Sequence, residues 1–410
     1  MTSEPVSEAY VWTWLPGSDT PVVAGRIEAV SDIVNFNYGR SYLERGDAIS
    51  LYAPELPLRR GLIPPPDGAR VAGCIADAGP DAWGRRVIRR RMSISDDAVD
   101  PGFVTFLLAS DSDRIGALDF QASPEIFVSR DDGSAPLEEL VEAAQRVEEG
   151  VAFSPALDQA LLHGSSVGGA RPKALLDDGV RKLIAKFSSA TDQYAVVKGE
   201  FAAMELARRA QLSVASVELR HVLDRDVLLV ERFDRPLGTR QRRAVVSAAT
   251  ILQLGDTPWR GASYAALAAR IRRDFRDAGD ALRELFSRIV FNILVGNTDD
   301  HARNHAALWD GVELGLTPAY DICPQPRSGG EAAQAMAISS SGFRLSRLDG
   351  CIAAAGEYLL AEDEAQEIVA RQVDVIRANW DDVAEIARMT DTEKRQFWGR
   401  QFLNPYAFES

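Results

Sequence analysis

A short polar run after a long apolar segment constrains this chain more than any other feature. The run Gly296–Asn304 reads GNTDDHARN and places Asp299 and Asn304 five positions apart. A second carboxylate, Asp321, follows two short apolar stretches that are joined by an Asp-Gly pair typical of a hairpin turn. The chain therefore has the order carboxylate, carboxamide, hairpin, carboxylate.

This order and spacing match a protein-kinase catalytic loop, H-R-D-x-x-x-x-N, and the metal-binding Asp that follows it. In that chemistry the first Asp accepts a proton from the substrate hydroxyl, and the Asn holds a magnesium ion. The later Asp binds metal across the nucleotide phosphates. The residues thus predict that Asp299 is a catalytic base and that Asn304 and Asp321 are metal ligands.

Two other interpretations of the same run remain open. Asp and Asn are common in turns because their side chains bond their own backbone, so the cluster could simply end a helix. His301 and His305 stand four positions apart, and on a helix they would present two imidazoles to a zinc ion. The zinc-protease motif requires Glu after the first His, where this chain has Ala302, so the kinase loop is the stronger interpretation.

Composition predicts a soluble globular protein of two or three structural units, since 410 residues include 46% hydrophobic and 26% charged residues. No stretch approaches the roughly 20 apolar residues of a membrane span, and Glu4 and Glu8 are untypical of a basic signal segment. Cys74, Cys323 and Cys351 form no Cys-x-x-Cys pair, which favours a reduced cytoplasmic setting. A net charge of −14 argues against broad nonspecific binding to nucleic acid.

Hydrophobic periodicity predicts a β-rich first third and a mainly helical last third. Strands are expected at Tyr10–Leu15, Val22–Val30, Ile33–Tyr38, Ala117–Gln121, Ala174–Leu176, Arg181–Phe187, Val214–His221, Val227–Phe233, Asn304–Trp309 and Val312–Leu316. Helices are expected at Pro80–Arg91, Phe103–Ala109, Leu137–Glu149, Lys198–Gln211, Ser247–Leu254, Ala262–Phe275, Ala281–Val295, Asp363–Ala378 and Asp391–Phe402. The expected fold is α+β: a two-lobed, protein-kinase-like fold with a β-rich N-terminal subdomain and a mainly helical C-lobe.

A glycine-rich segment, Gly164–Gly169, has the composition of a phosphate-binding loop, because glycine lets backbone amides approach phosphate closely. It lacks the kinase G-x-G-x-x-G spacing. It also departs from the P-loop, since Ala170 and Arg171 stand where that motif has Lys and Ser or Thr. Its place immediately before a strand pair still favours a nucleotide site.

Lys186, in the second of those strands, is the expected partner of the phosphates, because an ammonium group buried in an apolar strand needs an anion. In a kinase this lysine also pairs with a Glu of the next helix. Glu200 is the first candidate and Glu205 the reserve. Lys173 and Lys198 are weaker alternatives to Lys186, which could also reach solvent at a strand edge.

Four motifs, in this order, resemble the signature blocks of HipA-type serine/threonine kinases, the toxins of bacterial toxin–antitoxin modules. They are Ser166–Lys173, Val230–Arg235, Gly296–Asn304 and Thr317–Ile322. Three earlier segments, 41–43, 51–58 and Gly79–Arg85, resemble the opening domain of that family, so the likeness covers nearly the whole chain. It implies a β-rich N-terminal subdomain over 1–125, a kinase N-lobe core over 126–235 and a helical C-lobe over 236–410.

The resemblance implies a role for each matching position. Asp299 would be the catalytic base, and Asn304 and Asp321 would hold Mg²⁺. ATP would meet a larger set: Gly168, Gly169, Ala170, Arg171, Pro172, Lys173, Lys186, Glu231, Arg232, Phe233, His301, Ala302, Arg303, Asn304, Tyr320 and Asp321. Ser166 would be the serine that such kinases autophosphorylate, with Ser165 as the competing acceptor.

The resemblance also implies an ATP- and magnesium-dependent enzyme that phosphorylates a serine on an intracellular protein, with aminoacyl-tRNA synthetases as the known type of target. A HipB-like DNA-binding antitoxin would be its partner and would bring it to operator DNA, with no membrane involved. Two alternatives stay open: a catalytically silent co-repressor subunit, and a small-molecule kinase of similar fold. Asp300 stands where a small residue is usual, and is expected to add charge beside the base.

Overall fold

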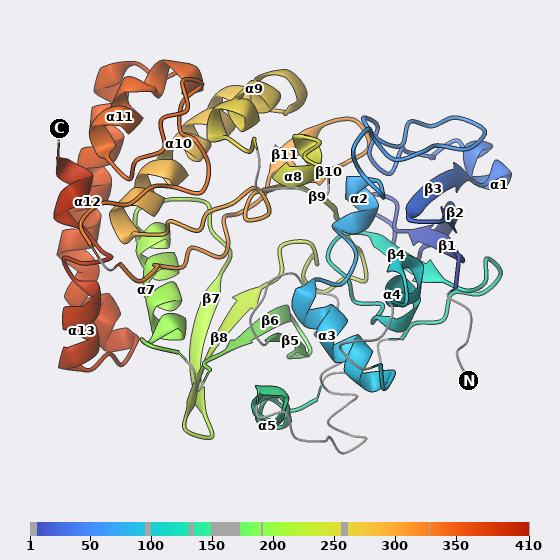
Figure 1. The fold of residues 1–410 in the computed structure, drawn as a ribbon, viewed down its shortest axis with the longest axis horizontal. Helices are drawn as coiled ribbons and strands as arrows, with labels where there is room; N and C mark the ends of the chain where they lie inside the picture. The colour runs from blue at the N-terminus through green and yellow to red at the C-terminus, as the bar shows by residue number, and fades with distance from the viewer. Residues whose placement is uncertain are drawn as a thin grey trace. The chain divides into compact units, whose positions relative to one another are not determined.

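Residues 6–94, 100–130, 135–148, 173–189, 192–255, 261–327 and 329–409 are described by a computed structural model. The chain divides into two units, which are treated separately below. The first unit takes residues 1–189, 221–246 and 308–312, and the second takes 190–220, 247–307 and 313–410. Strands dominate the first unit and helices the second (Figure 1), which confirms the predicted α+β class.

An antiparallel sheet of order β3-β2-β1-β4 organises the start of the first unit. Its strands are β1 (Glu8–Thr13), β2 (Val22–Val30), β3 (Ile33–Tyr38) and β4 (Leu118–Gln121). Gly25 of β2 pairs with Tyr38 of β3, and a Cβ at Gly25 would lie 2.2 Å from the carbonyl oxygen of Asn37. Only glycine therefore allows these two strands to approach so closely.

The described residues of the first unit form helices α1 (Arg40–Leu43), α2 (Gly73–Ala76), α3 (Ala82–Arg91), α4 (Phe103–Ala109) and α5 (Leu137–Glu148). Asp81 is the N-cap of α3, because its carboxylate accepts a 2.7 Å hydrogen bond from the backbone N–H of Gly84. Arginines fill the last turn of α3, where positive charge is favoured by the helix dipole.

A second four-stranded sheet has the order β5-β6-β8-β7. Its strands are β5 (Lys173–Asp177), β6 (Lys182–Phe187), β7 (Val217–Val222) and β8 (Arg225–Glu231). The turn between β5 and β6 needs Gly179 at a φ of 86°, as the Asp-Asp-Gly sequence predicts. Apolar residues of α5 and of three of these strands form one buried cluster: Leu140, Val141, Ala144, Ala174, Leu183, Ala185, Phe187, Val227 and Leu229.

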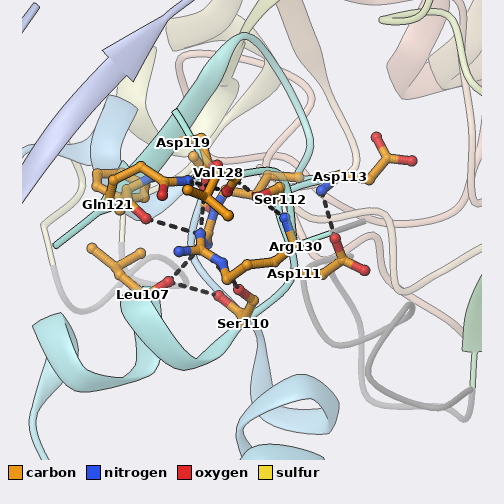
Figure 2. Close-up of polar contacts among 12 residues, drawn as sticks. Leu107, Ser110, Asp111, Ser112, Asp113, Asp119, Gln121, Val128 and Arg130 are labelled. Carbon is orange, nitrogen blue, oxygen red and sulfur yellow. Dashed lines mark hydrogen bonds and ion pairs between the residues drawn. The ribbon is translucent and has the colours of Figure 1, made fainter. Parts of the chain in front are cut away.

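A buried carboxylate, Asp119 of β4, collects charge and polar groups from the segment between α4 and residue 130 (Figure 2). It accepts hydrogen bonds from Arg114 Nε at 2.9 Å and from Arg130 Nη2 at 2.8 Å. Ser112 Oγ at 2.7 Å, Gln121 Nε2 at 2.8 Å and the backbone N–H of Phe120 at 2.7 Å also donate to it. The Arg114 side chain is also wholly buried, so this network fixes an irregular stretch of chain through polar contacts.

A second buried network joins residues just after β8 to the same stretch. The guanidinium of Arg232 contacts Asp113 at 2.9 Å and Asp234 at 2.8 Å. Arg235 contacts the same two carboxylates at 2.9 and 2.8 Å. Arg232 also donates to the carbonyl oxygens of Asp113 at 3.1 Å and Arg114 at 2.6 Å. Two cations therefore share two anions in the interior of the first unit.

We expect Asp113→Asn to lower the stability of the protein near neutral pH, and to cost progressively less as the pH falls from about 4 towards the much lower folded-state pKa. Burial alone would raise the pKa of Asp113, but the cations Arg232, Arg235 and Lys182 outweigh burial and hold that pKa well below its usual value. A carboxylate with a depressed pKa contributes stability above its unfolded-state pKa, and this contribution disappears as the pH falls through the folded-state pKa.

Urea unfolding of the parent and of Asp113→Asn at several pH values measures this difference. The free-energy gap between the two proteins should shrink as the pH falls below about 4, where the parent also begins to carry a neutral side chain in its unfolded state. A gap that stays constant into strong acid would contradict the assigned role of the Asp113 charge.

The second unit is built around helices. They are α7 (Val196–Arg209), α8 (Ala248–Ile251), α9 (Tyr264–Asp274), α10 (Ala278–Val295), α11 (Leu348–Ala353), α12 (Glu362–Ile386) and α13 (Asp391–Phe397), with two short 3₁₀ helices at Ala355–Tyr358 and Pro405–Phe408. Helix α10 packs against α9 and α12, and α12 packs against α7 (Figure 1). Residues 285–295 of α10 are all buried, as expected for a helix that is surrounded on every side.

Three short strands complete the described elements: β9 (Ala244–Ser247), β10 (Ala306–Trp309) and β11 (Leu314–Leu316). Strands β10 and β11 follow the polar run that ends at Asn304, at the place where the sequence predicts a hairpin. In the described part of the chain, no helix has the length and apolar character required to cross a membrane.

Candidate active site

The polar run begins where α10 ends, at a position that only glycine can occupy. Gly296 has a φ of 70° and caps α10 in the left-handed conformation. A Cβ at Gly296 would lie 2.9 Å from the carbonyl oxygen of Gln401. The loop therefore leaves the buried helix in one fixed direction, against a backbone segment near the C-terminus.

The loop folds so that Asn304 returns to Asp299. The backbone N–H of Asn304 donates to the carbonyl oxygen of His301 at 2.8 Å, and Asn304 Nδ2 donates to the carbonyl oxygen of Asp299 at 3.4 Å. The Asp299 side chain is exposed, whereas Asn304 is buried. The two residues that the sequence predicts as base and metal ligand thus lie side by side, with the carboxylate on the solvent side.

Asp321 lies in a strained backbone conformation close to this loop. Its φ is 60°, which is uncommon for a residue other than glycine and is concentrated at functional sites. The hydroxyl of Tyr320 donates to the carbonyl oxygen of Arg303 at 2.8 Å, and the N–H of Ala319 donates to the carbonyl oxygen of Ser213 at 2.7 Å. The Tyr320 bond holds the segment that carries Asp321 beside the Asp299–Asn304 loop, and the Ala319 bond ties the same segment to the residues that follow α7.

Asp300 does not add charge beside the base, as the sequence suggested, because its side chain points into the core. Only 3% of Asp300 is exposed, and Oδ2 accepts hydrogen bonds from Asn292 Nδ2 at 2.8 Å and Tyr264 Oη at 2.5 Å. His305 Nε2 lies 2.7 Å from the same oxygen. Burial raises the pKa of Tyr264 well above its usual value, and the charge of Asp300 adds to this effect, so the phenol stays a donor.

The same contacts remove the support for a zinc site at His301 and His305. His305 Nε2 is engaged by Asp300, and His301 Nδ1 accepts a 3.3 Å hydrogen bond from the N–H of Arg303. The run is a loop and not a helix, so the two imidazoles do not share a helical face. Among the residues that the structure describes, no group of three or more His, Cys, Asp or Glu side chains could hold a metal.

The two lysines of the predicted nucleotide site lie opposite each other in the first unit. Lys173 of β5 pairs directly with Lys186 of β6, so both side chains leave the same face of the sheet. Lys173 is only 3% exposed, and its Nζ lies 3.3 Å from Asp81 Oδ2. Trp83 Nε1 donates to the carbonyl oxygen of Lys173 at 3.3 Å. The start of α3 therefore holds both the side chain and the backbone of this lysine.

The reserve candidates for the lysine–glutamate pair are occupied by other contacts within the second unit. Glu205 accepts hydrogen bonds from Arg208 at 2.7 Å and from Arg209 at 2.9 Å. Lys198 contacts Glu393 at 3.1 Å. Glu200, the first candidate, is buried on α7.

Three of the positions predicted to meet ATP lie at the end of β8 and directly after it. Glu231 ends the strand, and the backbone N–H of Arg232 donates to the carbonyl oxygen of Lys182 at 2.9 Å. The Arg232 side chain is committed to the buried network with Asp113, so only its backbone remains for a ligand. Phe233 is half-buried.

Some predicted positions fall outside the described residues. They are Ser165, Ser166, Gly168, Gly169, Ala170, Arg171 and Pro172. Of the other loop positions, Ala302 is buried, His301 is half-buried and Arg303 is exposed.

Sequence reasoning missed the residues that support the site from behind. Asp81 and Trp83 lie in the Gly79–Arg85 segment, whose resemblance to the opening domain of the family predicts no role for either side chain. Tyr264 and Asn292 carry no signal in a single sequence, because their importance arises from contacts with Asp300 across the fold.

Two family models match the chain. The model described as HipA-like C-terminal domain matches residues 165–380, which is more than half of the 410 residues. The model described as HipA N-terminal domain matches residues 19–121.

One curated relative is the Sinorhizobium fredii (strain NBRC 101917 / NGR234) protein named "Putative kinase Y4mE", which is 32% identical over 147 residues. That match takes in 34% of this chain and about one third, 33%, of the length of the relative.

A solved structure of the Shewanella oneidensis MR-1 toxin–antitoxin system HipA, HipB and its operator DNA complex has a TM-score of 0.67 at 20% identity. It covers 94% of this chain and 97% of that chain, and it establishes the fold. The Helicobacter pylori proinflammatory kinase CtkA gives a TM-score of 0.38 at 14% identity over 56% of this chain and 93% of that chain, which is too low to support an argument.

Proposed function

The chain belongs to the HipA family, and from that premise we propose that it is an ATP- and Mg²⁺-dependent serine/threonine protein kinase. Its acceptor would be a serine on an intracellular protein of the aminoacyl-tRNA synthetase type, and its role that of the toxin in a toxin–antitoxin module. One observation supports this most strongly: Tyr320 ties the Asp299–Asn304 loop to Asp321, which has a left-handed backbone.

The donor atoms fit magnesium. Asn304 offers a carboxamide oxygen and Asp321 a carboxylate, and hard cations such as Mg²⁺ take oxygen ligands. Mg²⁺ is commonly held by one or two carboxylates together with substrate phosphates, so a site without three acidic side chains suits it. When bound, it would neutralise charge on the phosphate oxygens during transfer.

The residues of the chain would supply the catalytic base and the contacts to the nucleotide. The exposed carboxylate of Asp299 would accept the proton of the serine hydroxyl as that oxygen attacks the γ-phosphorus. Lys186 would contact the phosphates directly, and Lys173, opposite it on the same face of the sheet, would line them. The other proposed nucleotide contacts are Gly168–Pro172, the backbone of Glu231–Phe233, residues His301–Arg303 and Tyr320.

A HipB-like antitoxin, and operator DNA through it, are the proposed partners. The support is the similarity to the Shewanella protein, which was solved with HipB and operator DNA. Ser166 is the proposed autophosphorylation site. A phosphate there would add roughly −1.5 to −2 charges next to the nucleotide phosphates, and it would therefore oppose ATP binding.

Titration with ATP and Mg²⁺ tests the nucleotide part of the proposal. At a concentration one hundred times the dissociation constant, bound ATP should stabilise the parent protein by about 2.7 kcal/mol. We expect Lys186→Met to weaken ATP affinity at least about tenfold, because it removes a charge-assisted contact to phosphate worth roughly 1.5–3 kcal/mol. Calorimetric titration with a non-hydrolysable analogue measures the affinities.

Lys198→Met is the matched control, because it removes an equal charge that is already committed to Glu393. It should leave ATP affinity unchanged. Equal affinities for Lys186→Met and the parent would sink the assigned role of Lys186. No stabilisation of the parent by ATP would favour the catalytically silent alternative, and ATP binding without any labelled protein would favour a small-molecule kinase.

A further inference from the structure

We propose that the buried contact between Asp300 and His305 is a clamp that sets the geometry of the catalytic loop, with both residues acting as positioning residues. The inference rests on the proposed function, because it concerns the loop that carries Asp299 and Asn304. A kinase loop gives no role to Asp300 of the polar run or to His305, the residue that follows the run. In the second unit these two side chains contact each other.

The clamp joins the immediate neighbours of the two functional residues. Asp300 follows Asp299 in the chain, and His305 follows Asn304. Because His305 Nε2 and Asp300 Oδ2 lie 2.7 Å apart, the loop is closed at the points where Asp299 and Asn304 emerge from it. The contact therefore limits how far Asp299 and Asn304 can separate, together with the 3.4 Å bond from Asn304 Nδ2 to the carbonyl oxygen of Asp299.

The clamp is anchored to the helical core from below. Asp300 Oδ2 also accepts from Tyr264 of α9 and Asn292 of α10, and Asn292 Oδ1 in turn accepts from Asn297 Nδ2 at 3.0 Å. The buried carboxylate of Asp300 thus attaches the loop to helices α9 and α10. Asp300 Oδ2 keeps Asn292 and His305 as partners when the Tyr264 hydroxyl is removed, so the Tyr264 bond contributes stability without closing the loop.

Among the described residues, the imidazole of His305 has a hydrogen-bond partner at Nε2 only. His305 Nδ1 is buried and has no hydrogen-bond partner among the described residues, so the ring is held through Nε2. The ring also packs edge-on against Tyr264, with centroids 5.6 Å apart. The carbonyl oxygen of His305 still accepts a 2.7 Å hydrogen bond from the N–H of Ala248, so loss of the Nε2 contact would free the side chain and loosen the return arm of the loop without releasing it.

The rate of phosphoryl transfer is sensitive to the position of the reacting groups, so a displaced loop should lower it. A displacement of about 1 Å between reacting groups can cost on the order of 100-fold in rate. Tyr264 and His305 both contact the same oxygen of Asp300. Of these two contacts, only that of His305 joins the start of the loop to its end. A purely structural network would make the two bonds equivalent, whereas a clamp makes only the His305 bond important for turnover.

Two substitutions at His305 separate these cases. His305→Gln can place an N–H donor where Nε2 lies, whereas the shorter His305→Asn reaches only the place of Nδ1. Tyr264→Phe removes the other bond to Asp300 Oδ2 and is the control. We measure kcat for phosphoryl transfer, the stability to urea, and the hydrogen exchange of the Asn304 amide in all three variants and in the parent.

We expect His305→Asn to lower kcat on the order of 100-fold, and His305→Gln to recover most of that loss, to within about tenfold of the parent. Tyr264→Phe should lose stability but change kcat by less than about threefold. Exchange of the Asn304 amide should quicken in His305→Asn and not in Tyr264→Phe. Equal kcat values for the Gln and Asn variants, or a kcat that follows stability in all three, would overturn the clamp.

The exchange measurement keeps the clamp apart from the proposed function. If the parent transfers no phosphate, the proposed function fails, and unequal exchange at Asn304 still supports the clamp. If the parent is active and Asp299→Asn is not, but the Asn304 amide exchanges at the parental rate in His305→Asn, the proposed function survives and the clamp is wrong.

Discussion

Asp299→Asn is expected to lower the rate of phosphoryl transfer by about 10²–10⁴-fold while the protein stays folded. The asparagine side chain has nearly the same shape as the aspartate, but it cannot accept the proton of the serine hydroxyl. Because Asp299 is exposed, removal of its charge should leave the core intact. The expected loss therefore falls on kcat, measured by transfer of labelled phosphate from ATP, and the urea midpoint should not move.

Asp381→Asn is the control for this experiment, since Asp381 is an exposed aspartate of α12 in the same unit. It should keep parental activity. Peptide mapping of the Asp299→Asn protein after incubation with ATP and Mg²⁺ should find no phosphate at Ser166 or Ser165. Parental labelling of a protein target by Asp299→Asn would show that Asp299 is not the base.

Asp119→Ala is expected to destabilise the protein by about 3–5 kcal/mol, the usual cost of removing one partner from a buried ion pair. Arg114 would keep its charge in an environment with no exposed surface, and Arg130, Ser112 and Gln121 would each lose an acceptor. Urea unfolding followed by circular dichroism measures the loss, which is a large part of the stability of most domains.

Asp32→Ala provides the comparison within the same unit. Asp32 faces Arg70 at 3.8 Å with 80% of its side chain exposed, so its removal should change stability by less than about 1 kcal/mol. Similar losses for Asp119→Ala and Asp32→Ala would mean that the buried network contributes little.

Local sequence signals predicted the regular elements well where burial and turn chemistry agree. Strands β2 and β3 and helix α4 have the predicted boundaries, and Gly179 and Gly296 lie at the turns that their sequences indicate. These features depend on period, on apolar pattern and on glycine at positive φ, all of which can be read from neighbouring residues.

Other boundaries were wrong because distant contacts decided them. Helix α12 runs to Ile386, not Ala378, since Asn379 and Asp382 are held by Arg209 of α7 at 3.0 and 2.6 Å. The helix expected at Ser247–Leu254 is only the short α8, preceded by strand β9.

For the site, the spacing of Asp299 and Asn304 predicted that they lie together, and the structure agrees. The spacing did not predict that the Asp300 side chain is buried, because its burial depends on contacts with Tyr264 and Asn292. Asp300→Asn would disturb a buried network, so it is not the mild comparison that an exposed neighbour of the base would offer. Nor did the motif that includes Arg232 reveal that its side chain turns inward to Asp113.

The sharing of charges across the first unit limits how such a chain can be divided or recombined. Arg232, Arg235 and Lys173 come from the later part of the sequence, whereas their counter-ions Asp113 and Asp81 come from the earlier part. A protein truncated to begin at residue 165 would keep three buried cations and lose two of their anions. The earlier and later parts of the sequence therefore do not fold as independent modules. A chimera between relatives must exchange these cations and anions as matched sets.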